Sequence, residues 1–131
     1  MPKGQCHCGA VKYEMSTDTF HRGLCHCTDC RRHSGAPMVA WGLIKREDLK
    51  VQGETKEYAS SEHGRRHFCP NCGTSLFYTS DVYFPGQIDV QTATLDDPDA
   101  IPPDTQVQVA ERLGWVTKLE SIPAFQRYPG P

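Results

Sequence analysis

Seven cysteines in three closely spaced groups constrain this 131-residue chain more than any other feature. The groups are Cys6-x-Cys8, Cys25-x-Cys27-x-x-Cys30 and Cys69-x-x-Cys72. Cysteines separated by one or two residues can direct their thiolates at a common centre, as a tetrahedral zinc ion requires. Two pairs supply four ligands, which close a structural site, whereas the triplet supplies three, the number typical of a zinc ion whose fourth position takes water or substrate. The spacing therefore predicts two zinc ions per chain.

Disulfides and an iron–sulfur centre are the competing uses of clustered cysteines. The chain opens Met1-Pro2-Lys3 without the apolar segment or cleavage pattern of a secretory signal, so we expect a cytoplasmic protein. In that reducing compartment clustered cysteines bind metal more often than they pair, and an odd number cannot pair completely. An iron–sulfur cluster remains the alternative metal, although it usually takes four cysteines.

Composition argues against two classes of partner. Lys and Arg number 14 against 16 Asp and Glu, a net charge of −2, so no nucleic-acid surface is expected. The longest apolar stretch, residues 38–44, is interrupted by Gly42 and is far too short to span a membrane. We therefore expect small-molecule partners, with neither nucleic acid nor membrane among them.

Short segments of alternating polar and apolar residues predict a mainly β protein. Glycine, proline and asparagine turns separate them, and only residues 45–48 indicate a helical turn. We predict small antiparallel sheets in a single domain over residues 1–131, with the cysteine groups on the turns and with Trp41, Trp115 and Phe125 in the core. The expected strands are residues 11–15, 39–43, 49–51, 55–58, 66–68, 75–78, 87–92 and 106–110.

Three segments resemble the glutathione-dependent formaldehyde-activating enzymes and the related centromere protein V group. They are residues 4–14 (GQCHCGAVKYE), 25–37 (CHCTDCRRHSGAP) and 68–76 (FCPNCGTSL), with weaker similarity at residues 95–98 and around Trp115, Leu119 and Pro123. The resemblance covers roughly the whole chain and implies a mainly β fold.

The resemblance also implies which cysteines share an ion. Cys6, Cys8, Cys69 and Cys72 would hold a structural zinc, and Cys25, Cys27 and Cys30 a catalytic one. The implied activity is that of a carbon–sulfur lyase of the S-(hydroxymethyl)glutathione synthase type, which forms S-hydroxymethylglutathione from glutathione and formaldehyde. The structural site would connect residues 8 and 69, far apart in the sequence, so folding should depend on metal.

The charge of the triplet site favours this chemistry over hydrolysis. A zinc ion on three thiolates carries a net charge of −1, which makes it a weaker Lewis acid than zinc on three neutral histidines. A fourth thiol would enter as an electron-rich thiolate, suited to attack an aldehyde carbonyl. Arg31 and Arg32 could offset the negative charge, and His26, Asp29 and His33 are candidates for moving the proton.

Several of these residues could have purely structural roles or could simply be exposed to solvent. His33 follows Cys30 by three residues, which is ligand spacing, so it could close the triplet into a Cys3His site. The domain would then be a zinc-stabilised binding module without turnover. Arg31 and Arg32 could be a solvated turn, and His26 is expected to face solvent.

Overall fold

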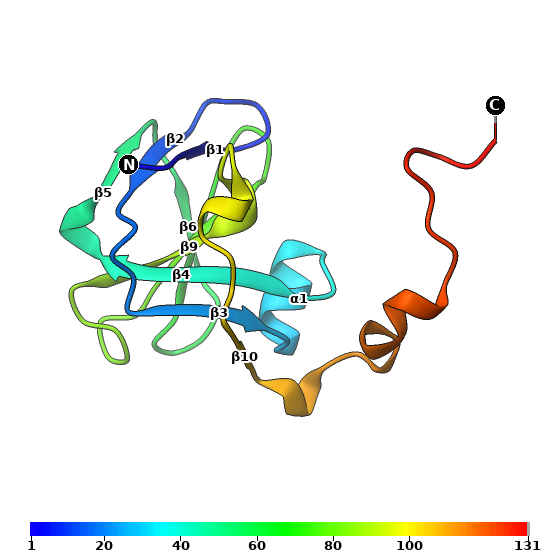
Figure 1. The fold of residues 1–131 in the computed structure, drawn as a ribbon. Helices are drawn as coiled ribbons and strands as arrows, with labels where there is room; N and C mark the ends of the chain where they lie inside the picture. Colours follow the sequence, from blue (N-terminus) through cyan, green and yellow to red (C-terminus); the bar gives the residue numbers. More distant parts are fainter. Residues whose placement is uncertain (131) are drawn as a thin grey trace.

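Two β-sheets make up most of the protein (Figure 1), whose computed structural model describes residues 1–130. The small sheet is antiparallel, in the order β1 (Lys3–Gln5), β2 (Lys12–Met15), β5 (Leu49–Gln52). The large sheet has seven strands, in the order β10 (Thr105–Val107), β3 (His21–Cys25), β4 (Val39–Lys45), β9 (Gln87–Gln91), β8 (Ser75–Thr79), β7 (Arg65–Phe68), β6 (Lys56–Ala59). The mainly β prediction is confirmed.

Each strand expected from alternation exists, with its ends shifted by a residue or two and one larger change. The segment predicted over residues 106–110 keeps its strand only to Val107, where β10 pairs with β3 in parallel. Gln108 then adopts a left-handed conformation (φ 57°), which a strand cannot accommodate, and a 3₁₀ turn follows at Val109–Glu111. The turn expected at residues 45–48 is the 3₁₀ turn Arg46–Asp48.

Two strands and one helix were not expected from the sequence. β1 and β3 are short, and Gly23 removes a side chain from the middle of β3, so neither shows clear alternation. Helix α1 (Thr28–Ser34) begins at Cys27, whose sulfur accepts the Cys30 N–H at 3.3 Å, and ends at Gly35 in the left-handed conformation. The cysteine triplet therefore lies on a strand end and a helix, and the prediction that every cysteine group occupies a turn was wrong.

The core joins the two sheets. Tyr13 of the small sheet packs its ring edge-on against Phe77 of the large sheet, with ring centroids 5.4 Å apart. Met15, Ile44 and Leu76 are fully buried in the same cluster. Apolar burial of this kind is the main favourable contribution to folding, so the small sheet is held against the large one by this contact.

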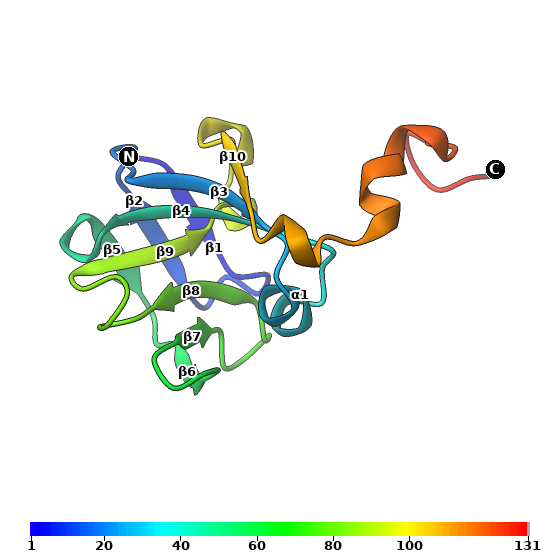
Figure 2. The same ribbon diagram turned by 90° about the horizontal axis from the view of Figure 1, so that it is seen from below.

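The C-terminal segment departs from the expected core. Residues 112–130 extend away from the sheets (Figures 1 and 2) and contain the 3₁₀ helix Gly114–Ser121. Trp115 is 55% exposed and Phe125 62% exposed, so their predicted place in the core was wrong, whereas Trp41 is buried as expected. The prediction of one domain over residues 1–131 stays a prediction, and residue 131 lies outside the described residues. Within residues 1–130 no helix has the length and apolar character that crossing a bilayer demands.

Candidate functional site

Four cysteines from two distant parts of the sequence converge at one point. The turn after β1 carries Cys6 and Cys8, and the turn between β7 and β8 carries Cys69 and Cys72; we call them the cysteine quartet. Their sulfurs all lie within 4.8 Å of one another. The Cys6–Cys8 sulfurs are 3.7 Å apart and the Cys8–Cys69 sulfurs 3.8 Å, whereas ligands about 2.3 Å from a tetrahedral zinc are about 3.8 Å apart. The quartet fits a zinc ion and is too open for disulfides.

Amide and hydroxyl donors point at the quartet sulfurs. Backbone N–H of Val11 donates to Cys6 Sγ at 3.2 Å, and Asn71 Nδ2 donates to Cys8 Sγ at 3.2 Å. The Asn71 contact lowers the pKa of Cys8, and hydrogen bonding to the side chain and backbone of Thr74 lowers the pKa of Cys72 to about 5. Such donors favour the thiolate, which is the form that binds metal.

The remaining three cysteines form a second cluster, the cysteine triplet. Cys25 ends β3, Cys27 caps α1, and Cys30 lies in α1, so their sulfurs meet within 4.8 Å where the strand passes into the helix. The structure groups the cysteines in the same two sets that the family resemblance implied. Both clusters could hold a metal ion, and the triplet offers one ligand fewer than a closed tetrahedral site needs.

Arg66 compensates the charge of the triplet. This side chain is 5% exposed, and both of its terminal nitrogens lie 3.7 Å from Cys30 Sγ. Its Nε donates to Ser60 Oγ at 3.2 Å, and its guanidinium lies 5.1 Å from the Tyr78 ring centroid. Hydrogen bonding with Cys25, and then with Cys27 and Arg66, lowers the pKa of Cys30 to about 5, so this thiol ionises first.

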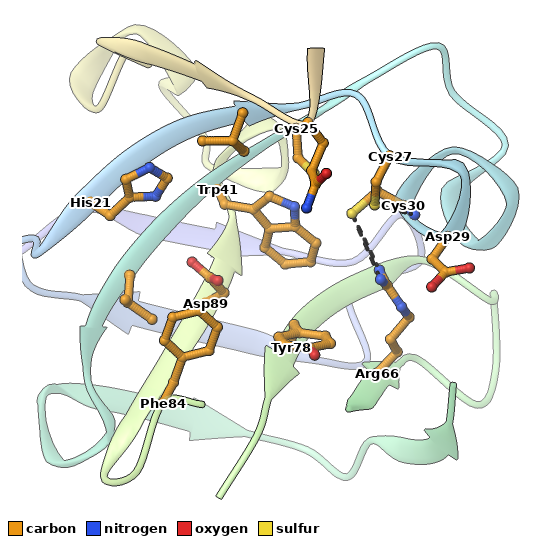
Figure 3. A pocket seen from close by; sticks show the side chains of 13 residues that line it. His21, Cys25, Cys27, Asp29, Cys30, Trp41, Arg66, Tyr78, Phe84 and Asp89 are labelled. Carbon is orange, nitrogen blue, oxygen red and sulfur yellow. Dashed lines mark hydrogen bonds between the residues drawn. The ribbon is translucent and has the colours of Figure 1, made fainter. Parts of the chain in front are cut away.

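The triplet borders a cavity of about 580 Å³ (Figure 3). Its walls are mostly apolar and aromatic, with a few charged groups, as in small-molecule sites. The lining residues are His21, Cys25, Cys27, Asp29, Cys30, Trp41, Leu43, Arg66, Tyr78, Phe84, Asp89, Val107 and Gln108.

Strand register explains why these residues share a cavity. One transverse row of the large sheet joins His21, Leu43, Asp89, Tyr78 and Arg66, each paired with the next on the adjacent strand. Side chains in directly opposed positions project from the same face of a sheet. The row therefore forms one wall of the cavity, with Arg66 nearest the triplet and Asp89 in its middle.

Asp89 is an unpaired acid in this wall. Its Oδ1 is buried and has no hydrogen-bond partner among residues 1–130. Burial, with a smaller contribution from the negative charge of Cys30, raises the pKa of Asp89 to about 7. The side chain lies between Trp41 and Phe84 in the cavity (Figure 3).

The histidines and arginines singled out in the sequence take different places. His26 is fully buried, contrary to the expected solvent exposure, and its Nε2 bonds Gln106 Oε1 at 2.8 Å. His33 Nδ1 bonds Ser75 Oγ at 3.0 Å, and neither ring nitrogen of His33 joins the sulfur cluster, so the Cys3His arrangement is not formed. Burial lowers the pKa of His33, and the charge of Arg66 adds to this effect.

Arg31 binds the Thr28 hydroxyl and the His26 carbonyl, and Arg32 is exposed; neither lines the cavity. Of the proton-moving candidates, Asp29 alone lines it. Arg66 and Asp89 also line it, and neither was singled out from the sequence. The sequence clue for both residues was a charged side chain inside a short predicted strand. Because successive side chains of a strand point to opposite faces, such a residue can project into a cavity on one face.

Comparisons with known proteins identify similar chains and a similar fold. An uncharacterized lyase of Schizosaccharomyces pombe is 30% identical over 58% of this chain and 56% of its own length, so the chain spans about half of that relative. A putative glutathione-dependent formaldehyde-activating enzyme of Halomonas elongata is 28% identical over 97% of this chain and 88% of its own length. A crystal structure of a Rhodobacter sphaeroides protein, 24% identical, superposes with a TM-score of 0.60 over 80% of this chain and 99% of that one, which shows a shared fold.

The family model of the glutathione-dependent formaldehyde-activating enzyme matches residues 1–111, which include both cysteine clusters and the cavity-lining residues. The chain therefore belongs to the glutathione-dependent formaldehyde-activating enzyme family.

Proposed function

We propose that the protein is a zinc-dependent carbon–sulfur lyase that handles a thiol–formaldehyde adduct, with glutathione as the thiol. The observation that carries the proposal is the difference between the two clusters: the quartet already has four sulfurs, whereas the triplet has three and borders the cavity. Membership in the family and the names of the relatives support this activity.

In this proposal the quartet is structural and the triplet is catalytic. A zinc ion on Cys25, Cys27 and Cys30 would supply a fourth coordination position at which an external thiol binds as its thiolate. The protein's part is to keep these three sulfurs together at the strand-to-helix junction and to hold the charge of Arg66 against Cys30. Arg66 therefore lowers the cost of gathering several thiolates in one place.

The bond changes occur between the two substrates. The thiol sulfur attacks the carbonyl carbon of formaldehyde, a carbon–sulfur bond forms, and the carbonyl oxygen takes a proton to give the S-hydroxymethyl adduct. Asp29 borders the cavity beside the cysteines and is exposed, so it can exchange that proton with solvent. Trp41 and Tyr78 add aromatic surface to the same cavity.

Zinc K-edge X-ray absorption tests whether a thiol enters the triplet. Seven cysteines shared by two zinc ions give an average of about 3.5 sulfurs per ion, and a bound thiol raises it to about 4. The proposal predicts this increase on adding glutathione to the wild-type protein, and no increase in Cys27→Ser. A constant sulfur number with a histidine nitrogen already present would favour the binding module without turnover.

A further inference from the structure

The unpaired carboxylate of Asp89 carries an inference about the substrate. Buried polar side chains are nearly always hydrogen-bonded, and an exception inside a ligand cavity calls for a partner. Asp89 Oδ1 has none among the described residues, although the side chain lies in the cavity wall. Its neighbours across the sheet are Leu43 and Tyr78, and the rings of Trp41 and Phe84 lie near it in the cavity (Figure 3); none of these four side chains is a cation.

The sheet register gives the order of the groups between this carboxylate and the triplet. Asp89 pairs with Tyr78 on the adjacent strand, and Tyr78 pairs with Arg66 on the next. Two strand spacings of about 4.8 Å separate Asp89 from Arg66, or about 10 Å. Arg66 in turn contacts Cys30 Sγ. A ligand whose sulfur lies at the triplet must therefore extend past the Tyr78 position, on the order of two strand spacings, to meet Asp89.

The surroundings of Asp89 select the chemistry of the group that it meets. A carboxylate accepts hydrogen bonds and attracts positive charge, and the aromatic rings of Trp41 and Phe84 on either side of it (Figure 3) also favour a cation. A carboxylate of the ligand would be repelled there. An ammonium group satisfies each of these conditions.

We propose that Asp89 is a specificity-determining residue that binds an ammonium group of the thiol substrate two strands along the row from Arg66, so that the cavity selects thiols of the γ-glutamyl peptide class. This inference rests on the proposed function, because it takes the thiol at the triplet as its anchor. The α-ammonium of the γ-glutamyl arm of glutathione, when extended, lies about 10 Å from the sulfur. The ammonium donates to Asp89, the α-carboxylate on the same carbon is directed away from Asp89, and the sulfur remains at the triplet.

A pair of thiols that differ in one group tests the assignment. Calorimetric titration of the zinc-loaded protein compares glutathione with its desamino analogue, glutaryl-cysteinyl-glycine. A charge-assisted hydrogen bond of this kind changes affinity by about tenfold to a hundredfold, so the wild-type protein should prefer glutathione by that factor. Equal affinities in the wild type would overturn the proposal without any variant having been made.

Two variants test whether the preference for glutathione over its desamino analogue depends on Asp89. Asp89→Asn keeps the size of the side chain and should bind both thiols with the weaker, desamino affinity. Asp81→Asn is the matched control, because Asp81 is an exposed carboxylate that pairs with Arg46 at 3.4 Å outside this cavity, and it should keep the wild-type preference. A preference that survives in Asp89→Asn would overturn the assignment.

A small thiol separates this inference from the proposed function. 2-Mercaptoethanol carries no ammonium, so it should bind the wild type and Asp89→Asn equally if the triplet takes thiols. Binding of 2-mercaptoethanol with no preference between the two tripeptides would overturn the role of Asp89 alone. Failure of all three thiols to bind would contradict the proposed function and the inference with it.

Discussion

Arg66 and Cys30 lie against each other across the junction between β7 and α1, with both terminal guanidinium nitrogens 3.7 Å from the sulfur. The arginine is buried, so its charge is weakly screened. This contact ties the large sheet to the helix that carries the triplet, and it gives the triplet its nearest positive charge.

Replacing Arg66 should weaken metal binding at the triplet. Arg66→Gln removes the charge that stabilises the Cys30 thiolate, and loss of a group that supports a metal ligand costs about tenfold to a hundredfold in metal affinity. Competition with a chromophoric chelator measures the affinity. Arg32→Gln is the control, since Arg32 is exposed and does not line the cavity. Equal losses of metal affinity in the two variants would contradict a specific role for Arg66 at the triplet.

The protein as purified without chelator should contain two zinc ions per chain. The quartet has four sulfurs and several hydrogen-bond donors, so its ion should be held more tightly than that of the triplet. Mass spectrometric metal analysis during stepwise chelation should show one ion leaving before the other. A single tightly bound ion would contradict two sites.

Cysteine substitutions should separate into two classes. Cys69→Ser breaks the quartet, which connects the first and third cysteine groups, and should lower the free energy of unfolding by several kcal/mol. Cys27→Ser should keep the β signal in circular dichroism while abolishing thiol binding. If the two variants lose the same stability in denaturant titrations, the division into structural and catalytic clusters is wrong.

The stability of Asp89→Asn should depend on pH differently from that of the wild type. The folded-state pKa of Asp89 is raised to about 7, above its ordinary value of 3.8, so the folded protein holds a proton there that the unfolded chain releases. The wild type therefore loses stability as pH rises from about 4 to 7, and the asparagine variant does not.

Denaturant titrations at pH 5 and pH 8 measure this difference. The variant should exceed the wild type in free energy of unfolding by a margin that grows by about 2 kcal/mol between these values. A margin that stays constant with pH would show that Asp89 ionises normally in the folded protein.

Local patterns predicted the three cysteine groups and most strands, whereas the joining of Cys6 and Cys8 to Cys69 and Cys72 was implied only by the family resemblance. Spacing brings cysteines together within one turn, and alternation marks a half-buried strand such as residues 39–43. The helix after Cys27 was not predicted because its cap is a sulfur in place of the usual Ser, Thr, Asp or Asn.

The remaining parts of the site depend on contacts between distant segments. Arg66 and Asp89 reach the cavity through strand register, which pairs residues from β7, β8 and β9 and leaves no mark in any one segment. His26 looks like a solvent-exposed residue between two ligands, but its partner Gln106 lies in a parallel strand 80 residues away. Trp115 and Phe125 were expected in the core on hydrophobicity alone, which does not specify what covers them.

Exchange spectroscopy at equilibrium tests the central claim most directly. Proton NMR of formaldehyde, glutathione and their adduct gives the exchange rate between free and adduct forms, which proceeds slowly without a catalyst. Formation of the carbon–sulfur bond at the triplet predicts faster exchange with the zinc-loaded wild type and the uncatalysed rate with Cys27→Ser. An unchanged exchange rate with the wild-type protein carrying two zinc ions would contradict the claim that the triplet is a catalytic site.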